Sequence, residues 1–362
     1  MKSTNIRKIG AACLLTLWLG LTVFAWFGSP KELSEAERRP LAQMPQISFE
    51  TLFSGAFMEK FETATLDQFP LRDAFRTLKA LAHYYGLRQT DNNGIYMAEG
   101  HAAKLLYPLD GEALRLAMER LNKVYDLYLK DTGSNIYVSV IPDKSYWLSD
   151  LTVDYETMFS TVEQAMPWAE YISLTDVLTV DDYYKTDIHW RQENLLPAAK
   201  YLAHAMGMAL EADFTQVPLD RPFYGVYHGQ AALPMEAETM VLMESESTKN
   251  ATVYDHETGK TVSVYDMEKL ESKDLYDVFL SGSKSLLTVE NPNAKTDKEL
   301  IVFRDSFASS MVPLLLETYK TVTLVDIRYI STEVLGNFID FTGQDVLFLY
   351  STTVLNTKGI LK

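Results

Sequence analysis

The sequence contains almost no cysteine. Cys13 is the single one, and it lies in an apolar N-terminal run, so the rest of the 362 residues offer no disulfide and no thiolate metal site. Basic residues are also scarce: 33 Lys and Arg stand against 49 Asp and Glu, a net charge of −16. Proteins that bind nucleic acid use Lys and Arg to neutralise phosphates. The composition therefore argues against nucleic acid as a partner, and also against an anionic membrane surface.

Charge is absent from residues 9–30, a run long enough to span the hydrocarbon core of a membrane. The basic residues Lys2, Arg7 and Lys8 precede it, which predicts a cytoplasmic N-terminus and an extracytoplasmic remainder. A cleaved signal peptide is the alternative, but no small-x-small cleavage pattern follows the run. We therefore expect residues 1–30 to form a signal anchor, a single transmembrane helix in the cell membrane.

Residues 31–362 alternate between short apolar runs and stretches with helical spacing of apolar residues. The spacing predicts helices over 49–69, 72–85, 111–130, 155–168 and 192–208, and the runs predict strands over 135–141 and 171–174. Residues 209–298 hold alternating runs between Gly, Asn and Pro turns, so we expect a β-rich insertion there.

The last third of the chain gives the clearest fold prediction. Three apolar runs alternate with two helical patterns, over strands 299–303, 321–326 and 345–350 and helices 307–318 and 332–340. A βαβαβ order predicts an α/β fold in three layers (αβα), with a parallel sheet covered by helices on both faces. In such sheets ligands bind beyond the carboxyl ends of the strands.

Ser306 lies at such a strand end, in the turn Arg304-Asp305-Ser306-Phe307. A serine at a sharp strand-to-helix turn can hold its hydroxyl out of the fold, and its backbone N–H sits where developing negative charge is stabilised. The turn is also typical of an ordinary helix N-cap. On local sequence both interpretations stay open, although N-caps are far more common than nucleophiles.

His189 stands apart from the other five histidines because Asp187 precedes it by two residues, just before a helical pattern. The Asp187 carboxylate can accept a hydrogen bond from one ring nitrogen and leave the other free as a base. The alternative is structural, with Asp187 as an N-cap and Trp190 as a core anchor. A metal site is disfavoured because these two residues give only two ligands and no cluster completes the set. We expect neither a metal nor a cofactor.

Four stretches together carry a resemblance to a known family. They are Ser34–Leu41 with Asp67–Arg72; Ile141-Pro142-Asp143-Lys144; Tyr184-Lys185-Thr186-Asp187-Ile188-His189-Trp190; and Arg304–Phe307 with Pro313 and Val325–Tyr329. In their order and spacing the chain resembles the DHHW family of bacterial surface proteins, which is grouped with the SGNH-hydrolase-like domains of alginate and other polysaccharide O-acetylation proteins. Ile188 replaces the first histidine of the name-giving motif, while the Asp-x-His pair is intact.

The resemblance implies a circularly permuted SGNH-like fold and a serine acyl-transfer site. Ser306 would be the nucleophile, His189 the base and Asp187 the residue that orients it, with the Ser306 N–H as first oxyanion donor. Arg328 and Lys144 are weaker candidates for binding substrate or the oxyanion. Tyr184 and Trp190, with their neighbour Tyr183 and with Trp147, are candidates for stacking on sugar rings.

These expectations point to O-acetyl transfer to a cell-surface polysaccharide. The related proteins imply a partner, a membrane-bound O-acyltransferase that supplies the acyl group. Esterase activity at the same site, a non-catalytic polysaccharide-binding protein and a metal-dependent hydrolase are the alternatives.

Overall fold

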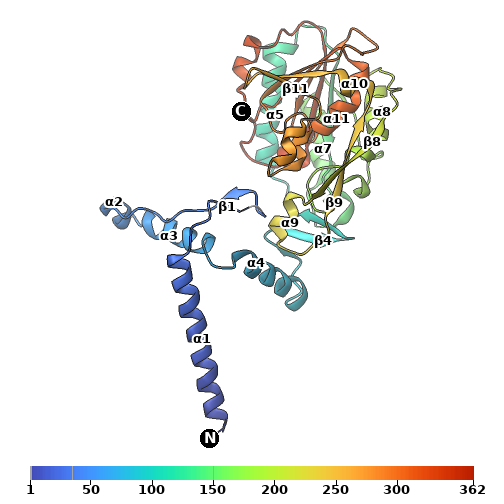
Figure 1. The fold of residues 1–362 in the computed structure, drawn as a ribbon. Coiled ribbons are helices and arrows are strands. Elements are labelled where there is room, and N and C mark those ends of the chain that lie inside the picture. The colour runs from blue at the N-terminus through green and yellow to red at the C-terminus, as the bar shows by residue number, and fades with distance from the viewer. Residues whose placement is uncertain (1, 35, 150) are drawn as a thin grey trace. The chain divides into compact units, whose positions relative to one another are not determined.

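The computed structural model describes residues 2–34, 36–149 and 151–362. The chain forms two compact units (Figure 1). Unit 1 comprises Met1–Asn93 and His228–Pro234; unit 2 comprises Gly94–Tyr227 and Met235–Lys362. The expected boundary at residue 30 remains a prediction.

Unit 2 is built on an eight-stranded sheet with the strand order β11-β10-β12-β14-β13-β15-β6-β7. The strands are β6 (Ile136–Ile141), β7 (Glu170–Tyr171), β10 (Thr252–Asp255), β11 (Lys260–Ser263), β12 (Leu286–Glu290), β13 (Glu299–Arg304), β14 (Thr321–Val325) and β15 (Asp345–Ser351). Strands β14, β13, β15, β6 and β7 run parallel, as the alternation of strands and helices predicts. At the other edge, β12, β10 and β11 pair antiparallel.

This antiparallel edge differs from the expected insertion. Strands β10, β11 and β12 continue the main sheet, since β12 pairs with β14 over five residues. Only β8 (Thr215–Phe223) and β9 (Glu238–Glu244), of the strands described in the region 209–298, form a hairpin outside that sheet. A second hairpin, β4 (Ile95–Ala98) with β5 (His101–Lys104), precedes the sheet in sequence. The sheet is therefore mixed instead of wholly parallel.

Two hydrophobic cores lie on opposite faces of the sheet. Along β13, Leu300 and Val302 belong to one core and Ile301 and Phe303 to the other, as the alternation of side chains across a strand requires. Helices α8 (Leu196–Ala205) and α11 (Ala308–Leu315) cover the first face, and α5 (Gly111–Val124) and α7 (Tyr155–Ala165) cover the second. Helices thus flank both faces, as expected.

The remaining elements of unit 2 are short. The short α-helices are α6 (Ser145–Leu148), α10 (Glu246–Asn250) and α12 (Thr352–Leu355), and a π-helical turn over Tyr125–Leu129 follows α5. The 3-10 helices cover Val180–Asp182, Gln192–Asn194, Met267–Glu271, Leu275–Val278, Leu316–Thr318 and Thr332–Asn337. Helix α9 (Val226–Ala231) contains residues of both units. The helix predicted over 332–340 is thus a shorter 3-10 helix, and the one predicted over 307–318 is α11 followed by a 3-10 turn.

Unit 1 begins with α1 (Lys2–Phe27), within which Arg7–Ala25 is long and apolar enough to cross a membrane. A signal sequence would meet the same criterion. The other elements are β1 (Leu33–Ser34), β2 (Arg39–Pro40), α2 (Phe49–Phe53), α3 (Ala56–Asp67), α4 (Arg72–Leu81), a π-helical turn (Ala82–Gly86) and β3 (Asp91–Asn92). The single helix predicted over 49–69 is two helices, because Gly55 adopts a left-handed conformation (φ 77°) between them.

An ion-pair network joins the two N-terminal stretches that resemble the family. Arg39 donates to both oxygens of the buried Asp67 carboxylate at 2.6 and 2.8 Å, and Arg72 lies 3.3 Å from it. Glu37 pairs with Arg72 at 2.5 Å and with Arg76 at 3.3 Å. The hydrogen bonds from Arg39 hold the pKa of Asp67 near 2, well below its usual range. The network fixes the β1–β2 turn against α3 and α4.

Candidate active site

The turn after β13 presents Ser306 and is tied down by Asp305. The buried Asp305 carboxylate accepts hydrogen bonds from the backbone N–H of Phe307 (3.0 Å) and from that of Ser351 at the end of β15 (2.7 Å). The N-cap of α11 is Phe307, and no side chain caps the helix. Asp305 thus accepts the hydrogen bonds of backbone N–H groups at this turn. The hydroxyl of the half-buried Ser306 is left available for other partners.

Arg304, at the end of β13, bonds to the helix that follows the same turn. Its side chain is fully buried, and Nη1 donates to the Ser309 hydroxyl in the first turn of α11 at 2.8 Å. Burial lowers the pKa of Arg304, although the nearby Asp326 carboxylate opposes this effect. A buried guanidinium bonded to the helix start makes the strand-to-helix turn rigid.

The structure brings Ser306, His189 and Asp187 together. His189 Nε2 lies 2.7 Å from Ser306 Oγ, and His189 Nδ1 lies 2.6 Å from Asp187 Oδ1. A carboxylate can only accept, so the proton belongs on Nδ1, and Nε2 is then the acceptor for the serine O–H. This is the hydrogen-bonded order of a nucleophile, a base and an orienting acid.

Two further hydrogen bonds hold the Asp187 carboxylate. Its Oδ1 also accepts from the His189 backbone N–H at 3.0 Å, and its Oδ2 accepts from the Val226 N–H at 2.8 Å. The preceding residue, Thr186, is fixed through its N–H and hydroxyl, which both donate to the Glu238 carboxylate (2.8 and 2.6 Å). Gly225 completes the enclosure, because a Cβ there would lie 2.3 Å from Asp187 Cα.

Two aromatic side chains hold the imidazole ring in place. Tyr276 stacks on His189 with ring centroids 3.9 Å apart and planes 10° from parallel, and Phe307 lies 4.9 Å away. The Tyr276 hydroxyl bonds to Ser310 Oγ at 2.7 Å, so the ring that supports His189 is itself anchored on α11. Burial raises the pKa of Tyr276 well above its usual range, which keeps it neutral.

The sugar-stacking prediction is wrong for Tyr184 and Trp190. Both side chains are completely buried. The Trp190 indole N–H donates to Ser310 Oγ at 2.8 Å and to the Phe307 carbonyl at 3.0 Å, and Tyr184 packs on Phe223. Tyr183 is buried as well. Loop aromatics here pack the core, and Trp190 positions α11.

Lys144 also differs from its expected role in binding substrate. Its side chain is 2% exposed, and Nζ donates to the backbone carbonyls of Tyr184 (2.9 Å) and Lys185 (3.4 Å). Burial lowers the pKa of Lys144 to about 7, even though the Asp187 and Glu238 carboxylates pull it upward. Lys144 therefore supports the chain that leads into Asp187 instead of facing solvent.

Arg328 follows β14 and forms an ion pair with Asp326. Its guanidinium donates twice to the buried Asp326 carboxylate, at 2.8 and 2.6 Å. Burial would lower the pKa of Arg328, but this ion pair raises it overall, so the side chain stays charged. Its part in binding substrate or an oxyanion remains a prediction.

The backbone N–H of Ser306 donates to no group in the described part of the chain. It is therefore available for an oxyanion that develops when Ser306 attacks a carbonyl. No cluster of three or more His, Cys, Asp or Glu side chains able to hold a metal occurs within the described ranges.

Sequence reasoning missed the residues that surround Asp187, His189 and Ser306. Tyr276 and Gly225 lie far from Asp187 and His189 in sequence, and neither stands in a recognisable motif. Asp305 was visible as part of the serine turn, but its bond to Ser351 depends on the pairing of β13 with β15.

The fold is similar to those of several solved structures. A DHHW family protein from Eubacterium siraeum matches with a TM-score of 0.58 and 17% identity over 75% of this chain and 94% of that one. Bacillus cereus PatB1 with a sulfonyl adduct matches with a TM-score of 0.58 and 18% identity over 74% and 97%. The O-acetyltransferase domain of Pseudomonas putida AlgJ is more distant, with a TM-score of 0.44 and 12% identity over 73% and 93%.

No family model matches the chain, and no curated protein matches it in sequence. At identities of 17% and 18%, the first two likenesses establish the fold. The expected resemblance to the DHHW group is thus found at the level of structure: the chain shares the fold of a DHHW family protein.

Proposed function

We propose that the chain is a serine acyltransferase or esterase that acts on acyl esters of a cell-surface polysaccharide. The observation that carries this proposal is the continuous hydrogen-bond chain Ser306 Oγ to His189 Nε2 (2.7 Å) and His189 Nδ1 to Asp187 Oδ1 (2.6 Å). A plain helix cap would not need a buried Asp–His pair aimed at the serine hydroxyl. The distances are those expected of a nucleophile already paired with its base.

The proposed reaction has two halves. His189 Nε2 takes the Ser306 proton as Oγ attacks the acyl carbonyl, and the Ser306 N–H stabilises the oxyanion. The C–O bond to the leaving alcohol breaks, the alcohol takes the proton from His189, and an acyl-Ser306 ester remains. His189 then deprotonates either a sugar hydroxyl or water, which attacks this ester and frees Ser306.

The choice of an acetyl group and of a polysaccharide acceptor rests on the family resemblance. The fold is shared with a protein described as a DHHW family protein, and the sequence resembles the same group. In this proposal the site lies outside the cytoplasm, where a membrane-bound O-acyltransferase would supply the acyl donor. A helix suited to anchoring supports it. A non-catalytic polysaccharide-binding protein is the second candidate.

An arylsulfonyl fluoride tests the nucleophile directly. Such reagents transfer a sulfonyl group to an activated nucleophile with loss of fluoride, and the similar PatB1 is described with a sulfonyl adduct. We expect the full chain in detergent to gain one sulfonyl group, mapped to Ser306 by peptide mass spectrometry. Ser306→Ala should gain none, and His189→Ala should react at least 100-fold more slowly because it lacks the base.

Ser309 provides an internal control, since it lies in the same helix start but bonds to Arg304. Labelling of Ser309 equal to that of Ser306, or no labelling of the wild type, would rule out an activated Ser306 and favour the binding protein. After acetylation by 4-nitrophenyl acetate, transfer to an added oligosaccharide identifies a transferase, and release of acetate alone identifies an esterase.

A further inference from the structure

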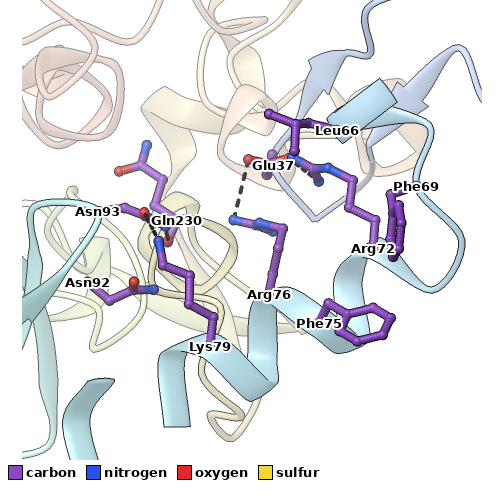
Figure 2. A pocket seen from close by; sticks show the side chains of 10 residues that line it. All are labelled: Glu37, Leu66, Phe69, Arg72, Phe75, Arg76, Lys79, Asn92, Asn93 and Gln230. Atoms are coloured by element: carbon purple, nitrogen blue, oxygen red, sulfur yellow. Dashed lines mark hydrogen bonds and ion pairs between the residues drawn. The ribbon is translucent and has the colours of Figure 1, made fainter. Parts of the chain in front are cut away.

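A hollow of about 480 Å³ lies within unit 1, and none of its lining residues belongs to the candidate active site. Its volume falls in the range of small-ligand pockets, about 300–1,000 Å³. Figure 2 shows its lining residues.

One face of α4 supplies the charge of this hollow. Arg72, Phe75, Arg76 and Lys79 are spaced by three or four residues, which places them side by side on the helix. Three of these four are cations, and Glu37 is the one carboxylate among the lining residues. In a chain of net charge −16, a lining with an excess of two positive charges favours an anionic ligand.

The amides in the hollow offer hydrogen bonds to a polar ligand. Asn92 is 2% exposed; its Nδ2 donates to the Ala231 carbonyl at 3.0 Å, while its Oδ1 has no hydrogen-bond partner among the described residues. A buried acceptor without a donor is costly, and a ligand hydroxyl would satisfy it. The Gln230 side chain lines the same hollow and has no partner within the described ranges.

Two aromatic rings complete the lining. Phe69 and Phe75 pack edge to face with centroids 5.5 Å apart, and Phe75 is 44% exposed. An exposed ring offers a flat apolar surface beside the charged groups. Lys79 reaches across to Asn93, where Nζ lies 3.4 Å from Oδ1, a weak contact that a ligand anion could replace (Figure 2).

We propose that this hollow binds an acidic sugar, a hexose ring that carries a carboxylate or phosphate. Lys79 and Arg76 contact the anion, Asn92 Oδ1 accepts from a ring hydroxyl, and Phe75 packs on the sugar face. The identity of this ligand as part of the acceptor polysaccharide rests on the proposed function; binding itself does not. The N-terminal stretches that resemble the family thereby gain a role in holding glycan, since Glu37 and Arg72 belong to them.

Binding is tested on the full chain in neutral-lipid nanodiscs, with Ser306→Ala so that no turnover interferes. The acidic probes are galacturonate tetrasaccharide and 6-phosphorylated maltotetraose, and the comparison ligands are neutral maltotetraose and inorganic phosphate. Calorimetry measures the affinity of each. We expect at least one acidic probe to bind at least tenfold more tightly than maltotetraose and phosphate. Lys79→Glu and Gln230→Ala should each weaken it, the former at least tenfold.

Lys60→Glu is the matched control, because Lys60 is an exposed lysine of the same unit that does not line the hollow. It should change binding less than twofold. If Lys60→Glu and Lys79→Glu weaken binding of the acidic probe equally, the probe is held only by general charge attraction. If inorganic phosphate binds as tightly as the acidic sugars, the hollow is a simple anion site. Either result overturns the proposal, as does the failure of every acidic probe to bind. Loss of binding in phosphatidylglycerol nanodiscs would identify a lipid headgroup as the occupant instead.

The outcome is independent of the catalytic proposal. Lys79→Glu in the chain that retains Ser306 should hydrolyse 4-nitrophenyl acetate at the wild-type rate, because this small ester needs no glycan contact. A variant that loses both glycan binding and ester hydrolysis would indicate unfolding, which thermal melting of each variant detects. If Lys79→Glu is unfolded, the Gln230→Ala variant takes its place: weaker glycan binding by folded Gln230→Ala supports the proposal, and unchanged binding overturns it.

Discussion

Lys144 lies in the core and bonds to main-chain carbonyls two and three residues before Asp187. Through this contact an amine fixes the segment that carries Asp187, whose carboxylate bonds to the His189 ring. A buried ammonium is expensive, and the protein tolerates it because three carboxylates, Asp187, Glu238 and Asp143, lie close enough to stabilise the charge. Lys144 is therefore a positioning residue whose protonation is linked to folding.

Lys144 should give the protein a measurable pH dependence of stability. Its pKa is about 7 when folded, below roughly 10.4 in an unfolded chain. Between these values the unfolded state binds more protons at this group, so its contribution to the free energy of unfolding rises with pH. From pH 7 to pH 9 we expect the wild type to gain about 2 kcal/mol relative to Lys144→Met.

Urea unfolding at the two pH values measures this difference. Lys200→Met on α8 is the control, because Lys200 is exposed and should leave the wild-type slope unchanged. Parallel stability curves for the wild type and Lys144→Met would show that Lys144 keeps an ordinary pKa.

At the scale of elements, the site depends on the close approach of the β8–α9 connection to the Asp187 segment. Gly225 leaves no room for a Cβ, which would meet Asp187 Cα and the Thr186 carbonyl at 2.3 Å. Gly225→Ala should displace Asp187 and lower kcat for 4-nitrophenyl acetate at least tenfold, since misplacement by about 1 Å can cost 100-fold. Stopped-flow release of nitrophenol measures it.

Gly111→Ala is the matched control for this substitution. Gly111 begins α5, and a Cβ there meets nothing within 4 Å, so kcat and melting temperature should be unchanged or slightly improved. Wild-type kcat in a folded Gly225→Ala variant would contradict the importance of this contact.

The sequence predicted the strands of the last third well, because buried parallel strands read as short apolar runs. It misassigned β10, β11 and β12, since their alternating pattern does not reveal which strand they pair with. Likewise, Asp187, His189 and Ser306 were visible through motifs, whereas the stacking of Tyr276 on His189 arises only from tertiary packing. Local pattern identified the elements and the chemistry, but neither the sheet edge nor the supporting contacts.

At the scale of the whole molecule, one chain combines a helix suited to a membrane with a unit that holds a Ser–His–Asp arrangement. A transferase that takes its acyl group from a membrane partner gains from such a tether, since the tether raises the local concentration of the two proteins. The benefit requires the helix to stay uncleaved and unit 2 to lie outside the cytoplasm. The lack of a small-x-small cleavage pattern predicts the first condition, and the basic residues before the helix predict the second. Both predictions can be measured.

The single cysteine makes the topology test simple. In a Cys13→Ser background, we expect a cysteine at Lys200 to react with a membrane-impermeant maleimide on intact cells, and a cysteine at Thr4 to react only after lysis. The mass of the purified chain should include residues 1–30. Reaction of Thr4→Cys on intact cells would reverse the orientation. A chain that begins after residue 27 would instead identify a signal peptide, and the proposed acyltransferase would then have to meet its acyl donor by diffusion.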